Sequence, residues 1–199
     1  LNMITNIPTG TNSYTSDIAI NPDNADEIMV VYSNYSLYSL FHSTDGGASW
    51  TKVAGNLEQN PSGSGNGPSC RTAEIIPLGN DTLYLVGTSV GLYGTANLDG
   101  TNTIWKQVAP QIIGSVVVEF LTYRPNDGLL IVGTHGNGIY QTNISSVGDV
   151  LALDDKQNNL NNITLYPNPT TDKLTLSFIT QKNTNTTWTL YTEIGRKIK

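Results

Sequence analysis

The segments Leu83–Thr95, LYLVGTSVGLYGT, and Leu129–Thr142, LLIVGTHGNGIYQT, are two copies of one pattern, and this repeat decides the fold. Each copy has an apolar stretch ending in VGT, a short turn that contains glycine, and a second apolar stretch that ends in threonine. Glycine-containing turns of this length join antiparallel strands. The repeat therefore predicts a structure built from β-hairpins.

Other short apolar stretches surround the hairpins, and turn-forming residues follow each of them. They are DIAI before NPDNAD (17–26), EIMVVY before SNYS (27–36) and VVVEFLTY before RPNDG (116–128). Each repeat can be read as four strands, A to D, over roughly 45 to 55 residues, which is typical of a β-propeller blade. The sequence therefore predicts an all-β fold class.

The chain divides by composition into three parts. Residues 1–144 hold about three four-stranded blades of a partial β-propeller, and the last blade lacks its fourth strand. Residues 145–162 have the polarity of a linker, with one docked apolar patch at Val150–Leu153. Residues 163–199 begin a second β segment, interpreted as half of an immunoglobulin-like β-sandwich. Because a propeller closes with at least about four blades, we expect the C-terminal part of a larger ring. In many closed rings the N-terminus supplies the missing outer strand.

The composition argues against several classes of function. With 199 residues, 38% of them hydrophobic, the chain is long enough for a packed core. A net charge of −6 disfavours binding along a nucleic-acid backbone, which needs clustered lysine and arginine. The sequence has no run of about 18 apolar residues, and its single cysteine, Cys70, gives no metal-ligand spacing. We expect no nucleic acid, no membrane span, no metal and no cofactor.

The segment Ser43–Trp50, STDGGASW, lies between two expected strands of the first blade. It resembles the Asp box, Ser-x-Asp-x-Gly-x-Ser/Thr-Trp, of the BNR repeats in sialidase-like, sortilin-like and xyloglucanase-like propellers. The residues that match this motif are Ser43, Asp45, Gly47, Ser49 and Trp50. A degenerate copy, NLDGTNTIW (97–105), keeps the Asp, Gly and Trp but not their spacing.

The Asp-box residues favour a structural role. Gly46 and Gly47 permit the positive φ angles of a tight hairpin turn, and Asp45 can accept hydrogen bonds from backbone N–H groups across it. We expect Trp50 to bury its ring against the sheet. A Ca²⁺ or sugar site is the alternative, although one carboxylate is few ligands for a hard cation. Strand parity places this turn at the end of the blade that carries the A–B turns.

A second resemblance lies in Leu165–Phe178, LYPNPTTDKLTLSF, followed by LYTEIGRKIK (190–199). The two segments resemble the opening of the type A C-terminal sorting domain of the type IX secretion system. The matching residues are Tyr166, Pro167, Asn168, Pro169, Gly195 and Arg196. The resemblance covers residues 163–199, roughly the first half of that domain, so we expect a truncated copy. It implies export by the type IX machinery to the medium or to the surface of a Gram-negative bacterium.

Three acidic residues lie at the expected starts of the A strands: Asp17, Glu74 and Glu119. We expect them at equivalent positions, approaching the central channel from neighbouring blades because the A strand is innermost. There they could raise one another's pKa values or recruit a cation, which would serve acid–base chemistry or ligand binding. The alternative is that each carboxylate accepts a hydrogen bond from an adjacent backbone N–H group.

The longer loops at the same end of the blades add further candidates, because binding residues concentrate on variable loops. They are Arg71, Tyr35, His135 and Asn137. For His135, in a glycine-rich loop, a simple turn position is the alternative to a base.

The residue inventory narrows the function. An Asp-box sialidase needs three arginines, but residues 1–144 hold only Arg71 and Arg124, and Arg124 lies in an A–B turn. We therefore predict a secreted or cell-surface module that binds an extracellular glycan or protein. The alternative is a glycoside hydrolase whose catalytic blades lie largely upstream, with one acidic residue of a carboxylate pair in this chain. A structural surface protein is a third possibility.

Overall fold

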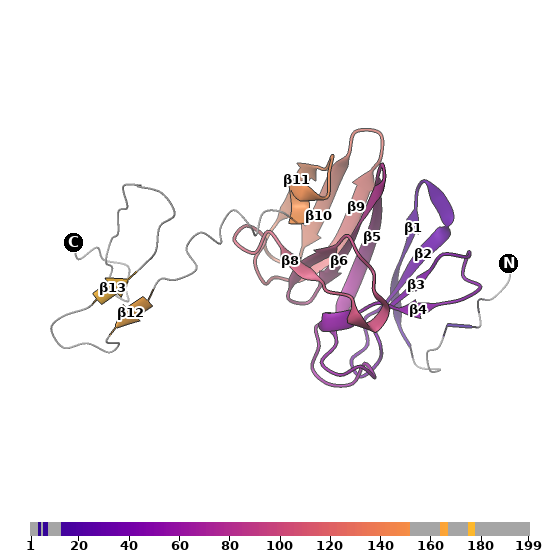
Figure 1. The fold of residues 1–199 in the computed structure, drawn as a ribbon, viewed down its shortest axis with the longest axis horizontal. Helices are drawn as coiled ribbons and strands as arrows, with labels where there is room; N and C mark the ends of the chain where they lie inside the picture. Colours follow the sequence, from indigo (N-terminus) through magenta and orange to yellow (C-terminus); the bar gives the residue numbers. More distant parts are fainter. Residues whose placement is uncertain (1–3, 5, 8–12, 152–163, 167–174, 178–199) are drawn as a thin grey trace. The chain divides into compact units, whose positions relative to one another are not determined.

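The computed structural model describes residues 4, 6, 7, 13–151, 164–166 and 175–177. The chain forms two compact units, Leu1–Leu153 and Asp154–Lys199. Every described sheet is antiparallel (Figure 1). The prediction of an all-β fold is therefore confirmed.

The first unit contains three sheets that we call the first, second and third blades. The first blade has β1 (Thr15–Asn21), β2 (Asn24–Tyr32), β3 (Leu40–Ser43) and β4 (Thr51–Lys52). The second has β5 (Cys70–Leu78), β6 (Asp81–Thr88), β7 (Gly91–Thr95) and β8 (Lys106–Val108). The third has β9 (Val118–Arg124), β10 (Leu129–Thr134) and β11 (Ile139–Asn143). Strands adjacent in sequence are adjacent in each sheet, as in propeller blades, and this part of the chain is a partial β-propeller.

Short helical turns connect the strands. They are η1 (Gly55–Leu57), η2 (Gly100–Asn102) and α1 (Gly148–Leu151). Helix α1 follows the third blade and contacts β7 and β8 of the second blade. It buries Val150, which is 5% exposed. The first compact unit therefore includes the chain as far as Leu153.

The inner strands β1, β5 and β9 pack against one another in that order (Figure 1). Each contains a β-bulge near its start, because the register shifts at the residue that follows the first pair. The bulged residues are Ser16, Arg71 and Glu119. A bulge adds one unpaired residue to its strand, so the residues beyond it pair with the neighbouring strand in a register shifted by one.

Two hydrophobic clusters fill the spaces between blades. The cluster between the first and second blades includes the fully buried Met29, Phe41 and Ile75. The cluster between the second and third includes the buried Leu85 and Leu130. Alternate residues of β5 contribute to the two clusters, because successive side chains of a strand point to opposite faces. The second blade is therefore buried on both of its faces.

The second compact unit contains β12 (Thr164–Tyr166) and β13 (Thr175–Ser177), which pair antiparallel. Thr164 pairs with Ser177, and Tyr166 pairs with Thr175. The other residues of the sorting motif lie outside the described residues: Pro167, Asn168, Pro169, Gly195 and Arg196. The proposed immunoglobulin-like sandwich lies outside them as well. In the described part of the chain, no helix has the length and apolar character needed to cross a bilayer.

Candidate functional site

The starts of the inner strands and the β2–β3, β6–β7 and β10–β11 connections meet at one end of the blades, which we call the loop end. A backbone hydrogen bond joins the two segments in every blade. The donor and acceptor residues are Ser33 and Tyr14, Ser89 and Ser69, and His135 and Val117. The loop end is where the sequence-predicted ligand residues lie.

Asp17 binds the neighbouring blade. Its Oδ2 accepts hydrogen bonds from the Thr72 hydroxyl at 2.6 Å and from the backbone N–H of Ala73 at 3.0 Å. Its Oδ1 accepts a bond from the N–H of Ile18 at 2.8 Å. Oδ2 therefore joins β1 to β5, while Oδ1 is engaged within β1.

Glu74 joins the second blade to the third through a hydrogen bond to the backbone. Its Oε1 accepts a hydrogen bond from the backbone N–H of Tyr123 in β9 at 2.9 Å. Burial raises the pKa of the Glu74 carboxyl, and the negative charge of Asp17 raises it further, against the lowering effect of the Tyr123 bond. Glu74 therefore holds its proton to a higher pH than an exposed glutamate.

The expectation that Asp17, Glu74 and Glu119 occupy equivalent positions is wrong. Asp17 directly follows the bulged residue of β1, Glu74 lies further along β5, and Glu119 is itself the bulged residue of β9. The same bulge follows the first pair of each inner strand, so the bulges do not cause this mismatch: the three acidic residues simply stand at different distances from the bulge, which the apolar pattern of the sequence does not reveal. The carboxylates of Asp17 and Glu74 accept hydrogen bonds from backbone N–H groups of the next blade.

Arg71 and Glu119 form an ion pair at the loop end. Arg71 Nη1 lies 3.4 Å from Glu119 Oε1, and the two side chains are 35% and 32% exposed. The Nε of Arg71 is buried and has no hydrogen-bond partner among the described residues. A half-exposed pair adds little stability, but it presents both donors and acceptors to solvent.

Tyr35 lies in the β2–β3 loop and is 64% exposed. Tyr14, which the sequence analysis missed, directly precedes β1 and is 67% exposed. The N–H of Tyr14 donates to the side-chain oxygen of Asn34, the neighbour of Tyr35. This bond brings two exposed tyrosines to the same edge of the loop end.

His135 and Asn137 are turn residues. The amide of Asn137 donates to the carbonyl of Ile113 at 3.2 Å, and its backbone N–H donates to the Thr134 hydroxyl at 3.2 Å. His135 is exposed, and its backbone N–H donates to the carbonyl of Val117. Hydrogen bonds within the β10–β11 hairpin and to the segment that precedes β9 therefore hold these residues.

The hollow beside Tyr35 is small. Its lining residues include Asn34, Tyr35, Glu58 and Pro68, and its volume is about 10 Å³. A space of this size holds at most one water molecule. A larger ligand at the loop end would therefore lie on the surface rather than in a deep pocket.

The turn at 43–50 uses its carboxylate internally. Asp45 accepts hydrogen bonds from the Ser49 hydroxyl at 2.6 Å, the Ser49 N–H at 2.8 Å and the Ser43 hydroxyl at 2.8 Å. The bonds from Ser49 and Ser43 lower the pKa of Asp45 to about 2. The N–H of Gly46 donates to the carbonyl of Asp26, near the β1–β2 turn and away from the loop end.

Trp50, which was expected to bury against the sheet, is only partly buried. Its Nε1 is buried but lacks a hydrogen-bond partner among the described residues. Trp105, at the corresponding place in the second blade, is 2% exposed. The difference arises because the first blade lies against Trp105, whereas no described blade precedes the first.

A buried polar cluster between the first and second blades was not foreseen from the sequence. Glu27, 8% exposed, accepts a hydrogen bond from the Tyr84 hydroxyl at 2.6 Å and lies 3.0 Å from His42 Nε2. Its second oxygen accepts a bond from the amide of Asn21. Burial alone would raise the pKa of Glu27, but the hydrogen bonds from Tyr84, Asn21 and His42 lower it.

The Glu27 cluster is poorly placed for catalysis. The side chains of His42 and Glu27 are only 12% and 11% exposed. The members come from four different strands, so no spacing along the sequence reveals them. Within the described ranges, no three His, Cys, Asp or Glu side chains gather closely enough to hold a metal ion.

No protein-family model matches the chain, and no curated protein matches it. Among solved structures, a GH74 enzyme of Niastella koreensis is 16% identical with a TM-score of 0.45, over 66% of this chain and 22% of its own. YCF48 of Cyanidioschyzon merolae is 14% identical with a TM-score of 0.43, over 71% of this chain and 37% of its own. A GH74 xyloglucanase of Xanthomonas campestris is 14% identical with a TM-score of 0.40, and the match covers 66% of this chain and 22% of the xyloglucanase. The chain thus spans well under half the length of these structures.

Proposed function

We propose that this chain is part of a secreted or cell-surface β-propeller that binds an extracellular glycan at the loop end. The observation that carries the proposal is the pair of exposed tyrosines, Tyr14 and Tyr35, at one edge of that end. A tyrosine ring offers an apolar face together with a polar hydroxyl. A sugar ring likewise has an apolar C–H face and a rim of hydroxyl groups, so the two surfaces are complementary.

The Arg71–Glu119 pair supplies the polar contacts of the proposed site. Only one of the N–H groups of Arg71 faces Glu119 in the ion pair, and a guanidinium carries five N–H donors. The remaining Nη donors, unlike the buried Nε, and the free lone pairs of the carboxylate suit sugar hydroxyls, which both donate and accept hydrogen bonds. Because the adjacent hollow is small, the ligand is a chain that lies across the surface.

Binding to a panel of soluble polysaccharides, measured by affinity electrophoresis and calorimetry, tests this proposal. Tyr35→Ala and Tyr14→Ala should each weaken binding by about tenfold, the loss of roughly one aromatic contact. Ile20→Ala is the control, since Ile20 is 53% exposed but lies near the end of β1, beside the β1–β2 turn and opposite the loop end. Retained polysaccharide binding in both tyrosine variants would disprove the site, and binding of a protein ligand instead would replace the glycan.

A glycoside hydrolase is the second candidate, favoured by the raised pKa of Glu74. A general acid in sugar hydrolysis must keep its proton near neutral pH. A glycoside hydrolase would also need a second catalytic carboxylate, supplied by further blades. Release of reducing ends from the polysaccharide panel, lost in Glu74→Gln, would support hydrolysis over simple binding.

We also propose export by the type IX secretion machinery, on the basis of the sequence of residues 163–199. The pairing of β12 with β13 agrees with the two strands expected on either side of the PNP segment. A reporter protein fused to these residues, produced in a type IX-competent bacterium, should reach the medium or the cell surface. Retention of the fusion in the periplasm, with a complete sorting domain exported in parallel, would refute this proposal.

A further inference from the structure

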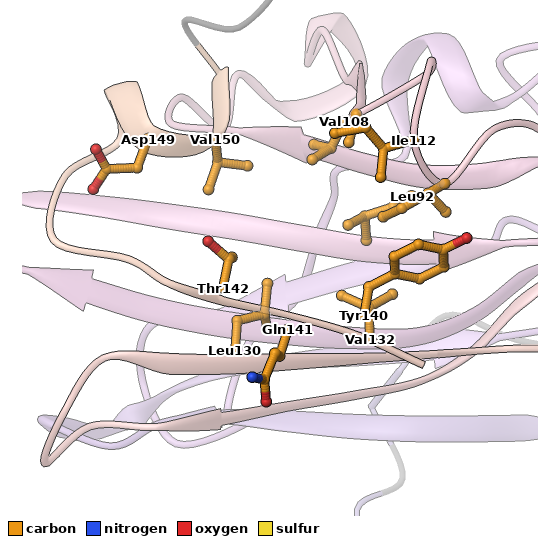
Figure 2. A pocket seen from close by; sticks show the side chains of 12 residues that line it. Leu92, Val108, Ile112, Leu130, Val132, Tyr140, Gln141, Thr142, Asp149 and Val150 are labelled. Atoms are coloured by element: carbon orange, nitrogen blue, oxygen red, sulfur yellow. The ribbon is translucent and has the colours of Figure 1, made fainter. Parts of the chain in front are cut away.

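Two hollows in the first unit have opposite character. The larger is a groove of about 210 Å³ between the second and third blades, beside β11 (Figure 2). Apolar side chains make up most of its lining, so it offers few hydrogen bonds to a polar ligand. The smaller is the hollow beside Tyr35 at the loop end, with a volume of about 10 Å³. Polar residues and glycines make up most of its lining, so it is suited to select a polar group.

Glu58 is the only charged residue among those that line the smaller hollow. Its Oε1 accepts hydrogen bonds from the backbone N–H of Ser39 at 2.8 Å and from the Ser39 hydroxyl. Its Oε2 has no donor among the described residues and is not buried. No lysine, arginine or histidine in the described ranges forms an ion pair with Glu58. The carboxylate in the hollow therefore has one oxygen free to bind a ligand.

The backbone around the hollow is held in a defined conformation. A Cβ atom added at Gly63, where φ is +86°, would lie 2.4 Å from the backbone N of Tyr38, so only glycine allows the two segments to approach this closely. Ser36, which also lines the hollow, has a φ of 62°, a value that is unusual for a residue other than glycine. Such conformations are concentrated at ligand-binding sites, and the Ser36 hydroxyl adds a further acceptor.

A primary ammonium group matches this hollow in size, charge and hydrogen bonding. The group is about as large as the single water molecule that the hollow can hold, and it carries three N–H donors. The free oxygen of Glu58 supplies a charge-assisted hydrogen bond to it. The ring of Tyr35, which is 64% exposed beside the hollow, attracts a cation at its face. A neutral hydroxyl gains neither of these charge interactions, and Glu58 repels an acidic sugar.

We propose that the hollow binds the protonated amine of an amino-sugar unit in the extracellular glycan. This inference rests on the proposed glycan binding at the loop end, and it names the class of glycan: a chain with free amines rather than a neutral or acidic chain. The amine enters the hollow while the sugar rings lie over Tyr35 and Tyr14. The net charge of −6 favours the approach of such a cationic chain.

Calorimetric titration of the full chain with a glucosamine oligosaccharide, at a pH below the pKa of the sugar amine, tests the inference. The fully N-acetylated oligosaccharide of the same length lacks the ammonium groups and should bind at least about tenfold more weakly. In Glu58→Gln, whose amide oxygen can still accept the bonds from Ser39, the two oligosaccharides should bind nearly equally. Asp81→Asn is the matched control, because it removes one negative charge at an exposed residue of the β5–β6 turn, away from the loop end.

Equal binding of the two oligosaccharides by the native protein would overturn the inference without any variant, and would leave glycan binding at the loop end intact. An equal loss of the preference in Glu58→Gln and Asp81→Asn would assign it to net charge rather than to the hollow, and would also overturn it. Binding of neither oligosaccharide nor any polysaccharide of the panel would refute the proposed function itself. Tighter binding of a lysine-containing peptide than of the glucosamine chain would make the ligand a protein and would count against both.

Discussion

The two spaces between blades are made from similar sequences but differ in what fills them. The space between the first and second blades is closed by Trp105 and contains the hydrogen-bonded carboxylate of Glu27. The space between the second and third is open at its outer side and is bridged by the carboxylate of Glu74. The comparison shows that a blade buries its neighbour fully only where its fourth strand is in place.

The largest expected effect is the loss of Trp105. Trp105→Ala removes a 2%-exposed ring and its hydrogen bond to Val53, so it should lower the free energy of unfolding by about 3–5 kcal/mol. Urea denaturation monitored by far-UV circular dichroism measures this change. Trp50→Ala is the control and should cost clearly less, because Trp50 is only partly buried. Equal losses in the two variants would contradict the idea that blade contact determines burial.

The Glu27 cluster gives the next largest effect. In Glu27→Gln the new amide faces the donor of Asn21, so the variant should be less stable by about 1–3 kcal/mol at neutral pH. The folded-state pKa of Glu27 is lowered from 4.5, so its stabilisation is present above about pH 4.5 and is lost as the pH falls through the folded value. Unfolding curves of both proteins should therefore converge in acid, and a constant difference down to about pH 3 would argue against this assignment.

The turn at 43–50 should contribute less, because Asp45 is exposed. Asp45→Ala removes the hydrogen bonds from Ser43 and Ser49 and should lower the melting temperature modestly. The pKa of Asp45 is lowered to about 2, so the advantage of the native protein persists above the ordinary carboxyl pKa and is lost only as the pH falls toward about 2. Polysaccharide binding by the folded variant should be unchanged, and its loss would place the turn in the site.

Glu74→Gln should have the smallest effect at neutral pH, within about 1 kcal/mol, because the glutamine oxygen can still accept the bond from Tyr123. The pH dependence has the opposite sign to that of Glu27. The folded-state pKa of Glu74 is raised, so its contribution is present below the ordinary value and is lost as the pH rises through the folded value. Chemical denaturation from about pH 4 to about pH 8 should show this decline in the native protein alone. The same decline in the variant would exclude Glu74 as its source.

Much of the fold of the first unit was predictable. The VGT hairpins at Leu83–Thr95 and Leu129–Thr142 correspond to β6–β7 and β10–β11, and the turn-forming segments separate the strands as expected. These features are local, because alternation and turn chemistry depend on residues near in sequence. The length of the third repeat predicted three strands for that blade, and among the described residues its sheet has β9, β10 and β11.

The candidate site was predictable only in part. The placement of Arg71 and Glu119 at one end followed from strand parity, but their ion pair depends on the bulges of β5 and β9. Asp17 and Glu74 are not equivalent, because Asp17 directly follows the bulged residue of β1 whereas Glu74 stands three residues after that of β5. The exposure of Tyr14 could not be read from its neighbours, because it depends on how the chain enters β1.

Antiparallel blades with tight, glycine-containing turns follow from the sequence, since each strand and each turn is specified within a few residues. Contacts between distant residues of the folded chain are needed to explain why Trp105 is buried while Trp50 is only partly buried, why Glu27 meets Tyr84, and why a groove opens beside β11. These outcomes depend on contacts between blades. Such contacts join residues that are far apart in the sequence, so they are set by strand register and by burial and cannot be read from the local sequence pattern.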